Sequence, residues 1–277
     1  MVEAPRIRIL YENVRHITNK KIVKAYGSSY KKIGINLEGY FIKKWWYAGK
    51  YIYVWLTKPG SNDYVIRTHT MMYGKIIVVN QQTPSPKLKP FLVLELDDGT
   101  VLQWYLAQIK ILDPNCSDDL VKSNYAECSS MESISHSMQM AVYDISNDAF
   151  NMDTLVAHIK NNYWKLEDDN MVDFLLNQEF FPGVGNILQQ EALYRCRILP
   201  TKKVREITFD QIILLVNELS NVIKLLYQSY VNKKENKPHT PIFQIYHKAY
   251  CPLEHKTITK YLGKRNRRTT WCPICQK

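Results

Sequence analysis

Four residues that can bind a metal ion stand in two close pairs near the C-terminal end of the sequence: Cys251, His255, Cys272 and Cys275. Zinc prefers four thiolate or imidazole ligands in a tetrahedron, and the spacings Cys-x3-His and Cys-x2-Cys supply such a set. Because protein ligands fill all four positions, we expect a structural zinc ion and no catalytic metal. The paired spacing argues against the alternative of three unrelated cysteines and a surface histidine.

The segment between the two pairs is basic and contains the stretch KTITKYLGKRNRRTT, residues 256–270. Thr, Ile and Tyr alternate in its first half, Gly263 supplies a turn, and Thr269–Trp271 can return as a second strand. This pattern predicts a β-hairpin with cations at its tip. Such a hairpin is suited to lie along a phosphate backbone.

A second candidate for chemistry is the amino terminus, MVEAP. Removal of Met1 would leave Val2 with a free α-amine whose usual pKa of about 7.7–8.0 keeps roughly a third of the molecules neutral at pH 7.5. A neutral amine can attack an aldehyde-like carbon and form a Schiff base, and Glu3 could serve as a general acid or base beside it. Without further context, a disordered terminus is the simpler interpretation.

The stretch FFPGVGNILQQEAL, residues 180–193, breaks at Pro182, Gly183 and Gly185 and resumes as a predicted helix at Asn186. Asn is a strong N-cap residue, and the free amides at a helix N-terminus attract phosphate. The alternative is an ordinary helix–turn–helix connection with no ligand.

Composition limits the class of protein. The chain has 277 residues, of which 45% are hydrophobic, so it can bury a core without disulfides. The formal net charge of +11 favours a polyanionic partner, and nucleic acid is the commonest one. We find neither a membrane-spanning run nor a secretion signal, and six sparse cysteines are typical of a reducing compartment.

The elements predicted from periodicity define an α+β fold. Residues 5–18 form an apolar helical stripe, and about 21–113 contain short strands rich in Tyr, Val, Ile and Trp, which predict an antiparallel β-sandwich. Helices are then predicted at 150–162, 170–180, 186–198 and 208–231, and a strand at 242–250. The expected domains are an N-terminal helix and sandwich, a linker, a helical domain and a zinc hairpin, at residues 1–113, 114–135, 136–240 and 241–277.

In this order, the pieces resemble the formamidopyrimidine-DNA glycosylase/endonuclease VIII (Fpg/Nei) family along nearly the whole chain. The matching stretches are MVEAP, AGKYIYVWL around Lys50, HTMMYG at 69–74, FFPGVGNILQQEAL and NRRTTWCPIC at 266–275. The chain is most similar to members that begin with valine instead of proline, namely the third vertebrate paralogue and its giant-virus relatives. The resemblance implies a helix–two-turn–helix in the helical domain.

The resemblance also implies base-excision repair, in which a damaged base is flipped out and its glycosidic bond is cleaved. Val2 would attack the sugar C1′, and Glu3 would protonate the sugar or the leaving group. Lys50 matches the lysine that contacts the phosphate next to the lesion, and we count it with Val2 and Glu3 among the expected catalytic residues. The other positions that match DNA-contacting residues are His69, Met72, Asn186 and Arg267.

Among these positions, Met72 would fill the hole left by the flipped base, although its type also suits the core of the sandwich. Arg267 stands five residues before Cys272 and matches the arginine with which the zinc hairpin grips phosphate. The zinc site would therefore hold one functionally necessary arginine in place.

Three departures from the family pattern lead to further expectations. Val2 offers a primary amine, whose imine can lose its proton and become a poorer electron sink, so strand cleavage should be weaker than base removal. The stretch WYLAQIKIL at 104–112 lacks the Arg-x-Phe of relatives that contact the opposite strand, which favours tolerance of single-stranded or bubble DNA. The loop NKKENKPHTP at 232–241 is short, so oxidised pyrimidines and hydantoins are expected substrates ahead of 8-oxoguanine.

We therefore expect a monomeric DNA glycosylase and AP lyase with a structural zinc ion, damaged DNA as its partner and no membrane association. It would act in the nucleus or at the site of viral DNA replication. A first alternative is a catalytically inactive zinc-containing DNA-binding protein of the same fold, and a second is an RNA-binding module with a zinc site.

Overall fold

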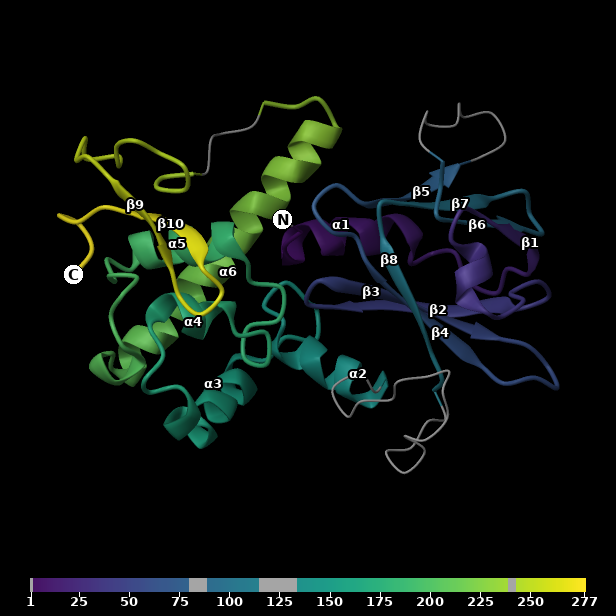
Figure 1. Cartoon of the computed structure of the whole chain (residues 1–277), viewed down its shortest axis with the longest axis horizontal. Coiled ribbons are helices and arrows are strands. Elements are labelled where there is room, and N and C mark those ends of the chain that lie inside the picture. The colour runs from purple at the N-terminus through teal and green to yellow at the C-terminus, as the bar shows by residue number, and fades with distance from the viewer. Residues whose placement is uncertain (1, 80–88, 115–133, 239–242) are drawn as a thin grey trace. The chain divides into compact units, whose positions relative to one another are not determined.

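The structure is a computed structural model that describes residues 2–79, 89–114, 134–238 and 243–277. The chain divides into two compact units (Figure 1). The N-terminal unit contains Val2 and Ile7–Gln139, and the C-terminal unit contains Glu3–Arg6 and Met140–Lys277. The peptide bond between Val2 and Glu3 therefore joins one unit to the other.

Among its described residues, the N-terminal unit contains most of helix α1, the first part of helix α2 (Ile134–Tyr143) and two antiparallel four-stranded sheets, which the sequence predicts as a sandwich. Helix α1 spans Ala4–Val14. The first sheet has the strand order β1-β6-β7-β5, with bounds Ile22–Tyr26, Leu92–Leu96, Val101–Tyr105 and Lys75–Val79. The second has the order β2-β3-β4-β8, with bounds Phe41–Ala48, Tyr51–Thr57, Tyr64–His69 and Gln108–Leu112.

One hydrophobic core holds α1 and the two sheets together. The predicted stripe of α1 is buried, with Ile7 and Val14 at 0% exposure. Trp45 of the second sheet stacks on Trp104 of the first with ring centroids 6.3 Å apart, and the Trp104 indole N–H donates to Thr68 Oγ1 at 3.1 Å. Alternation along the strands places such residues inward, and their burial supplies most of the driving force for the sandwich.

The C-terminal unit is mostly helical, and its four later helices confirm the four predicted ones. Their bounds are Met152–Asn161 for α3, Met171–Leu176 for α4, Asn186–Arg195 for α5 and Phe209–Lys234 for α6. Short 3₁₀ turns lie at Tyr163–Lys165 and Val204–Glu206, and another at Tyr30–Ile33 in the N-terminal unit. Helix α2, Ile134–Tyr143, was not predicted, because the polar stretch before it obscures its start.

The predicted basic hairpin is present as β9, Ile258–Leu262, and β10, Arg267–Trp271. The strand predicted at 242–250 is wrong, since residues 243–249 form bends and turns. The reason is Glu191 of α5, which is fully buried and accepts hydrogen bonds from three successive amides, those of Gln244, Ile245 and Tyr246, at 2.8–3.1 Å. Three amides that converge on one carboxylate cannot alternate as they would in a strand.

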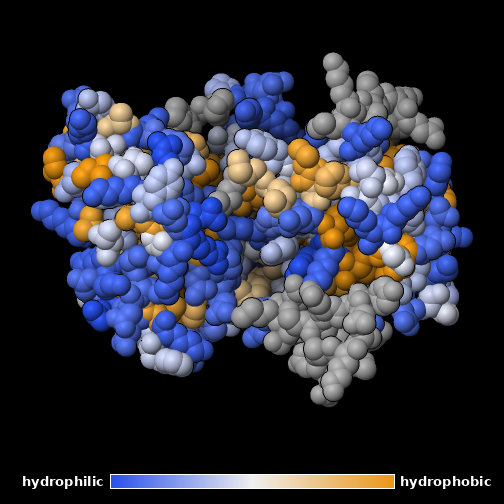
Figure 2. Space-filling model, viewed as in Figure 1, coloured by the Kyte–Doolittle hydropathy of each residue, from blue (hydrophilic) through white to orange (hydrophobic). Residues whose placement is uncertain are grey.

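The face shown in Figure 2 differs between the two units. Hydrophilic residues cover most of the C-terminal unit on this face, whereas hydrophobic residues gather over the sheets of the N-terminal unit. None of the helices among the described residues is both long and apolar enough to cross a membrane.

Candidate active site

The amino-terminal segment is tightly held, which excludes the disordered terminus considered from sequence. The Val2 side chain is 1% exposed and packs in the core of the N-terminal unit. Two residues later, the Ala4 N–H donates to the Gly183 carbonyl at 3.0 Å within the C-terminal unit. Val2 is therefore held within the N-terminal unit, and Ala4 within the C-terminal unit.

Glu3 is almost fully buried, at 3% exposure, and its carboxylate lies at the N-terminus of α5. Oε1 accepts the Ile187 N–H at 2.8 Å, and Oε2 accepts the Leu188 N–H at 3.1 Å. The positive end of the helix macrodipole stabilises a carboxylate at this place. Gly185 makes the approach possible, because a Cβ there would lie 2.4 Å from Glu3 Oε1.

This arrangement corrects the expectation for the glycine turn. Gly185 is the N-cap residue of α5 and Asn186 is its first residue, so Asn186 does not cap the helix. Two of the helix N-terminal amides are occupied by Glu3 and are not offered to a phosphate. No local pattern indicates these contacts, since Glu3 is more than 180 residues away from its partners.

Asn186 instead connects α5 to the basic hairpin. Its Nδ2 donates to the Arg268 carbonyl at 2.8 Å. Gln190, one turn further along α5, donates to the same carbonyl at 3.1 Å and accepts the Thr270 N–H at 2.8 Å. Arg267 is the first residue of β10 and directly precedes this junction. Asn186 therefore contacts the residue that follows Arg267 in the C-terminal unit.

Lys50 and His69 lie close together in the N-terminal unit. Lys50 is in the two-residue turn between β2 and β3, where Ala48 pairs with Tyr51 and Gly49 has a φ of +59°. Tyr51 in turn pairs with His69 at the end of β4, with ring centroids 5.2 Å apart. Burial, followed by the positive charges of Lys50 and Arg67, lowers the pKa of His69 below its usual 6.5.

His69 is therefore neutral at physiological pH. Its Nδ1 accepts the Met71 N–H at 3.3 Å, so the ring proton is on Nε2. Nε2–H can donate to a phosphate oxygen beside the ammonium group of Lys50. The Met72 side chain, three residues further on, is 51% exposed, which contradicts the alternative that it belongs to the sandwich core.

The four predicted metal ligands form one cluster in the C-terminal unit, and their ligand atoms all lie within 4.8 Å of one another. Cys251 Sγ is 3.7 Å from His255 Nδ1 and 3.9 Å from Cys275 Sγ. A tetrahedral zinc site with such ligands has edges of roughly 3.5–3.8 Å, so the residues fit the ion. Burial raises the pKa of Cys251, but amide hydrogen bonds from Leu253 and His255 outweigh it and lower that pKa to about 6, which favours the thiolate that zinc requires.

Two phenols that sequence reasoning did not identify lie near Glu3. Burial and the negative charge of Glu3 raise the pKa of both Tyr230 and Tyr246. Tyr246 belongs to the turn that Glu191 fixes, and its ring is 4.3 Å from that of His247. No pattern in the sequence connects these residues to the amino terminus.

Comparisons with known proteins agree with this geometry. A family model for the formamidopyrimidine-DNA glycosylase H2TH domain matches residues 143–230, which include α4, the glycine turn and α5. A Lactococcus lactis Fpg bound to DNA that contains an AP site shares the fold, with a TM-score of 0.70 at 16% identity over 99% of each chain.

Closer relatives match the whole chain. The chain is 50% identical over 276 residues to an Endonuclease 8-like protein of Acanthamoeba polyphaga mimivirus, covering 100% of both. A crystal structure of a viral DNA glycosylase matches all of the chain with a TM-score of 0.91 and 49% identity. These two full-length matches, together with the H2TH domain, define the class as DNA glycosylases. The full-length identity shows that this chain belongs to the Fpg/Nei family and is similar to its Endonuclease 8-like members.

Proposed function

We propose that the protein removes oxidised pyrimidines and hydantoins from DNA through a Schiff base on the α-amine of Val2, with weaker AP lyase activity. The observation that carries the proposal is the buried Glu3 carboxylate, fixed through both oxygens by the amides of Ile187 and Leu188 and covalently next to Val2. A carboxylate held at a defined place beside an amine nucleophile suits repeated proton transfer at one carbon.

In the proposed reaction, the Val2 nitrogen forms a bond to C1′ while the bond from C1′ to the base breaks. The base leaves with the bonding electrons and takes up a proton. The Glu3 carboxylate then takes a proton from the attached amine and passes it to the ring oxygen as the bond between that oxygen and C1′ breaks, which opens the sugar and leaves a protonated imine. Because Val2 is a primary amine, this imine can become neutral, which slows the β-elimination that cleaves the strand.

Several residues would hold the DNA around the lesion. Lys50 and His69 would be a pair of donors in the N-terminal unit, and in the C-terminal unit Asn186 contacts the residue next to Arg267. Exposed Met72 would fill the space of the flipped base, since an unbranched thioether adapts to an irregular cavity. These roles follow from family resemblance, and the proximity within each unit supports them.

The same resemblance suggests a preference for single-stranded or bubble DNA. The turn between β7 and β8 presents Leu106, which is 44% exposed, and no Arg-x-Phe pair occurs there. With few groups to grip the undamaged strand, the enzyme would gain little from a duplex. We place its action in the nucleus or at the site of viral DNA replication.

Base release tests this proposal. Processed protein, checked by mass for loss of Met1, is mixed with single-stranded and duplex DNA carrying one oxidised pyrimidine or hydantoin. We expect base release, faster on the single strand, and its loss in Glu3→Gln. Binding without release on any of these substrates would contradict the proposal and favour the catalytically inactive DNA-binding alternative.

A further inference from the structure

The tip of the zinc hairpin rests on two carboxylates near the start of α4. Asp173 Oδ1 accepts the Lys264 backbone N–H at 2.8 Å, and Asp169 Oδ1 lies 2.5 Å from the Lys264 ammonium. Gly263 allows this approach, because it has a φ of +74° and a Cβ there would lie 2.5 Å from Asp173 Oδ1. The turn of the hairpin is therefore shaped to fit this pair of acids.

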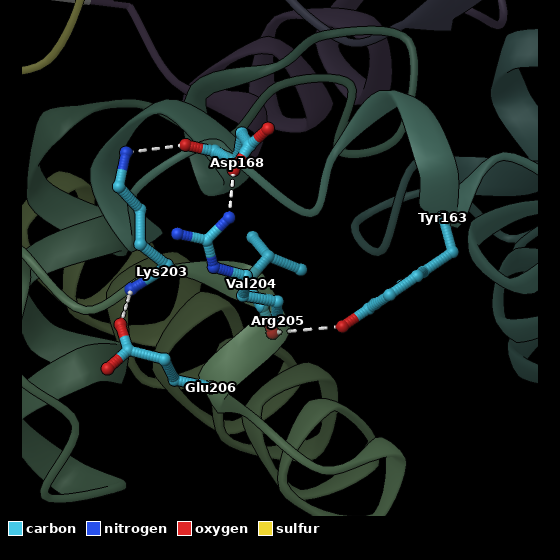
Figure 3. Close-up of polar contacts among 6 residues, drawn as sticks. All are labelled: Tyr163, Asp168, Lys203, Val204, Arg205 and Glu206. Carbon is cyan, nitrogen blue, oxygen red and sulfur yellow. Dashed lines mark hydrogen bonds and ion pairs between the residues drawn. The ribbon is translucent and has the colours of Figure 1, made fainter.

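The two acids are themselves held by the C-terminal unit. The Asn170 side chain accepts the Asp173 N–H at 2.9 Å as the N-cap of α4, and the Asp169 carbonyl accepts the Val204 N–H at 2.9 Å. Figure 3 shows how the neighbouring Asp168 is fixed by Lys203 and Arg205 from the turn that also contains Val204. The hairpin tip thus rests on a support that is itself held by hydrogen bonds.

Arg267 lies between this support and a second one. Three residues before it, Lys264 is bound by Asp173, and one residue after it, the Arg268 carbonyl is bound by Asn186 and Gln190. In the hairpin itself, Arg267 pairs with Leu262 as the pair closest to the tip. Both ends of the short backbone segment that contains Arg267 are therefore fixed.

Stability alone does not explain the contacts at the tip. The Lys264 side chain is 74% exposed, and exposed ion pairs contribute little to the free energy of folding. The two acids can instead hold the hairpin tip in one conformation. A flexible tip would have to lose conformational entropy when it binds a phosphate, and a tip that is already fixed avoids this cost.

We propose that Asp169 and Asp173 are positioning residues for Arg267, holding the hairpin tip so that the guanidinium is ready to contact a DNA phosphate. The inference rests on the proposed DNA-binding role of Arg267. Asp169 and Asp173 would therefore increase the affinity for DNA, although they are acidic residues in a protein with a net positive charge. Removal of an acid near DNA would ordinarily be expected to strengthen binding.

The first measurement is the affinity of the zinc-loaded full chain for DNA that contains a tetrahydrofuran abasic analogue. We expect Asp173→Ala to weaken binding roughly tenfold, which corresponds to the loss of one hydrogen bond to a charged group. Asp173→Asn keeps an oxygen that accepts the Lys264 N–H and should restore most of the affinity. Asp153→Ala is the matched control, since it removes an aspartate from the first turn of α3, which also has an asparagine N-cap.

The second measurement is the rate of tryptic cleavage at Lys264 and Arg265 in the same zinc-loaded proteins without DNA. Asp173→Ala should be cut faster, and Asp173→Asn and Asp153→Ala should be cut like the unmodified protein. The double variant Asp173→Ala, Arg267→Ala should bind DNA no more weakly than Arg267→Ala alone, because the acid acts through the arginine.

Unchanged cleavage in Asp173→Ala would overturn the inference, as would additive losses in the double variant. Unchanged or tighter DNA binding by Asp173→Ala, while Arg267→Ala binds weakly, would overturn it as well and leave the proposed function standing. If Arg267→Ala itself binds normally, the proposed role of Arg267 is wrong, and the inference falls with it.

Discussion

At the scale of single residues, Glu3 shows how the site is built from groups far apart in the sequence. Its carboxylate is held by two helix amides, and Gly185 is the residue that leaves room for it. The sequence suggests that Gly185 is needed for a turn. In the structure it is needed to leave space for the Glu3 carboxylate. A substitution at this glycine should act on catalysis through Glu3.

We expect Gly185→Ala to lower the rate of base release by about 10²-fold, because the added Cβ would lie 2.4 Å from Glu3 Oε1 and push the carboxylate out of place. Single-turnover base release measures this effect. Gly34→Ala is a suitable comparison, since no atom lies within 4 Å of the added Cβ, although its φ of +73° costs some stability. Equal rates for Gly185→Ala and the unmodified protein would show that the position of Glu3 is unimportant.

A second prediction at this scale concerns pH. His158 stacks on Tyr143 with centroids 4.5 Å apart and lies 4.7 Å from Phe180. Burial, the largest cause, lowers the pKa of His158 below its usual 6.5. The unfolded chain then binds the proton more readily than the folded one, so the stability from this site is present above about pH 6.5 and is lost as the pH falls through the folded pKa.

Thermal unfolding at pH 7.5 and pH 5.5 tests the pH prediction. The unmodified protein should lose more stability at the lower pH than His158→Gln, which cannot take up a proton. The variant should still lose some stability at the lower pH, because burial also lowers the pKa values of His69 and His247. An identical loss in both proteins would contradict the assignment to His158.

At the scale of elements, α5 organises most of the C-terminal unit. Its first turn binds Glu3, the side chains of Asn186 and Gln190 hold β10, and Glu191 fixes the turn at 244–246. One helix thus supports the carboxylate, the basic hairpin and the turn that contains Tyr246. A helix of moderate length can do this because its two polar faces point to different partners.

We expect Glu191→Ala to lower the free energy of unfolding by about 2–4 kcal/mol, because three amides would lose their acceptor, one of them on fully buried Ile245. Denaturant unfolding measures the change. Glu191→Gln keeps one carbonyl oxygen and should lose less. Two variants of equal stability would mean that the charge, and not the hydrogen bonds, is what matters.

Zinc removal is the test for the hairpin. The four ligands hold the base of β9 and β10, and a hairpin of this size does not fold by itself. Chelation should therefore reduce DNA affinity by at least about tenfold, while the circular dichroism of the helices changes little. Full DNA affinity after confirmed loss of the metal would contradict a structural role for the site.

The elements themselves were largely predictable from sequence, whereas the contacts of the site were not. The stripe of Ile7, Leu10 and Val14 predicts α1, since a period of 3.6 depends only on neighbouring residues. The bonds from Glu191 to residues 244–246 replace the predicted strand with a turn, and those from Glu3 to α5 occupy two helix amides that the sequence pattern offers to a phosphate. Both errors arise from long-range hydrogen bonds, which local patterns do not contain.

At the scale of the whole molecule, the chain combines a net charge of +11 with two units that each contain part of the predicted site. Lys50, His69 and Met72 belong to the N-terminal unit, and Asn186, Arg267 and the metal cluster to the C-terminal one. The Val2–Glu3 bond places the proposed nucleophile in the first unit and the proposed acid in the second. DNA binding should therefore require both units, and catalysis should depend on the intact N-terminal segment.

Borohydride trapping on single-stranded DNA with one oxidised base tests most directly whether the α-amine of Val2 is the nucleophile. Mass-checked protein without Met1 should form a covalent complex with the DNA, and blocking the α-amine of Val2 should abolish it. Lys50→Ala should still form the complex, although more slowly, because its amine is not the one proposed to attack C1′. Trapping that survives the blocked amine would contradict Val2 as the nucleophile.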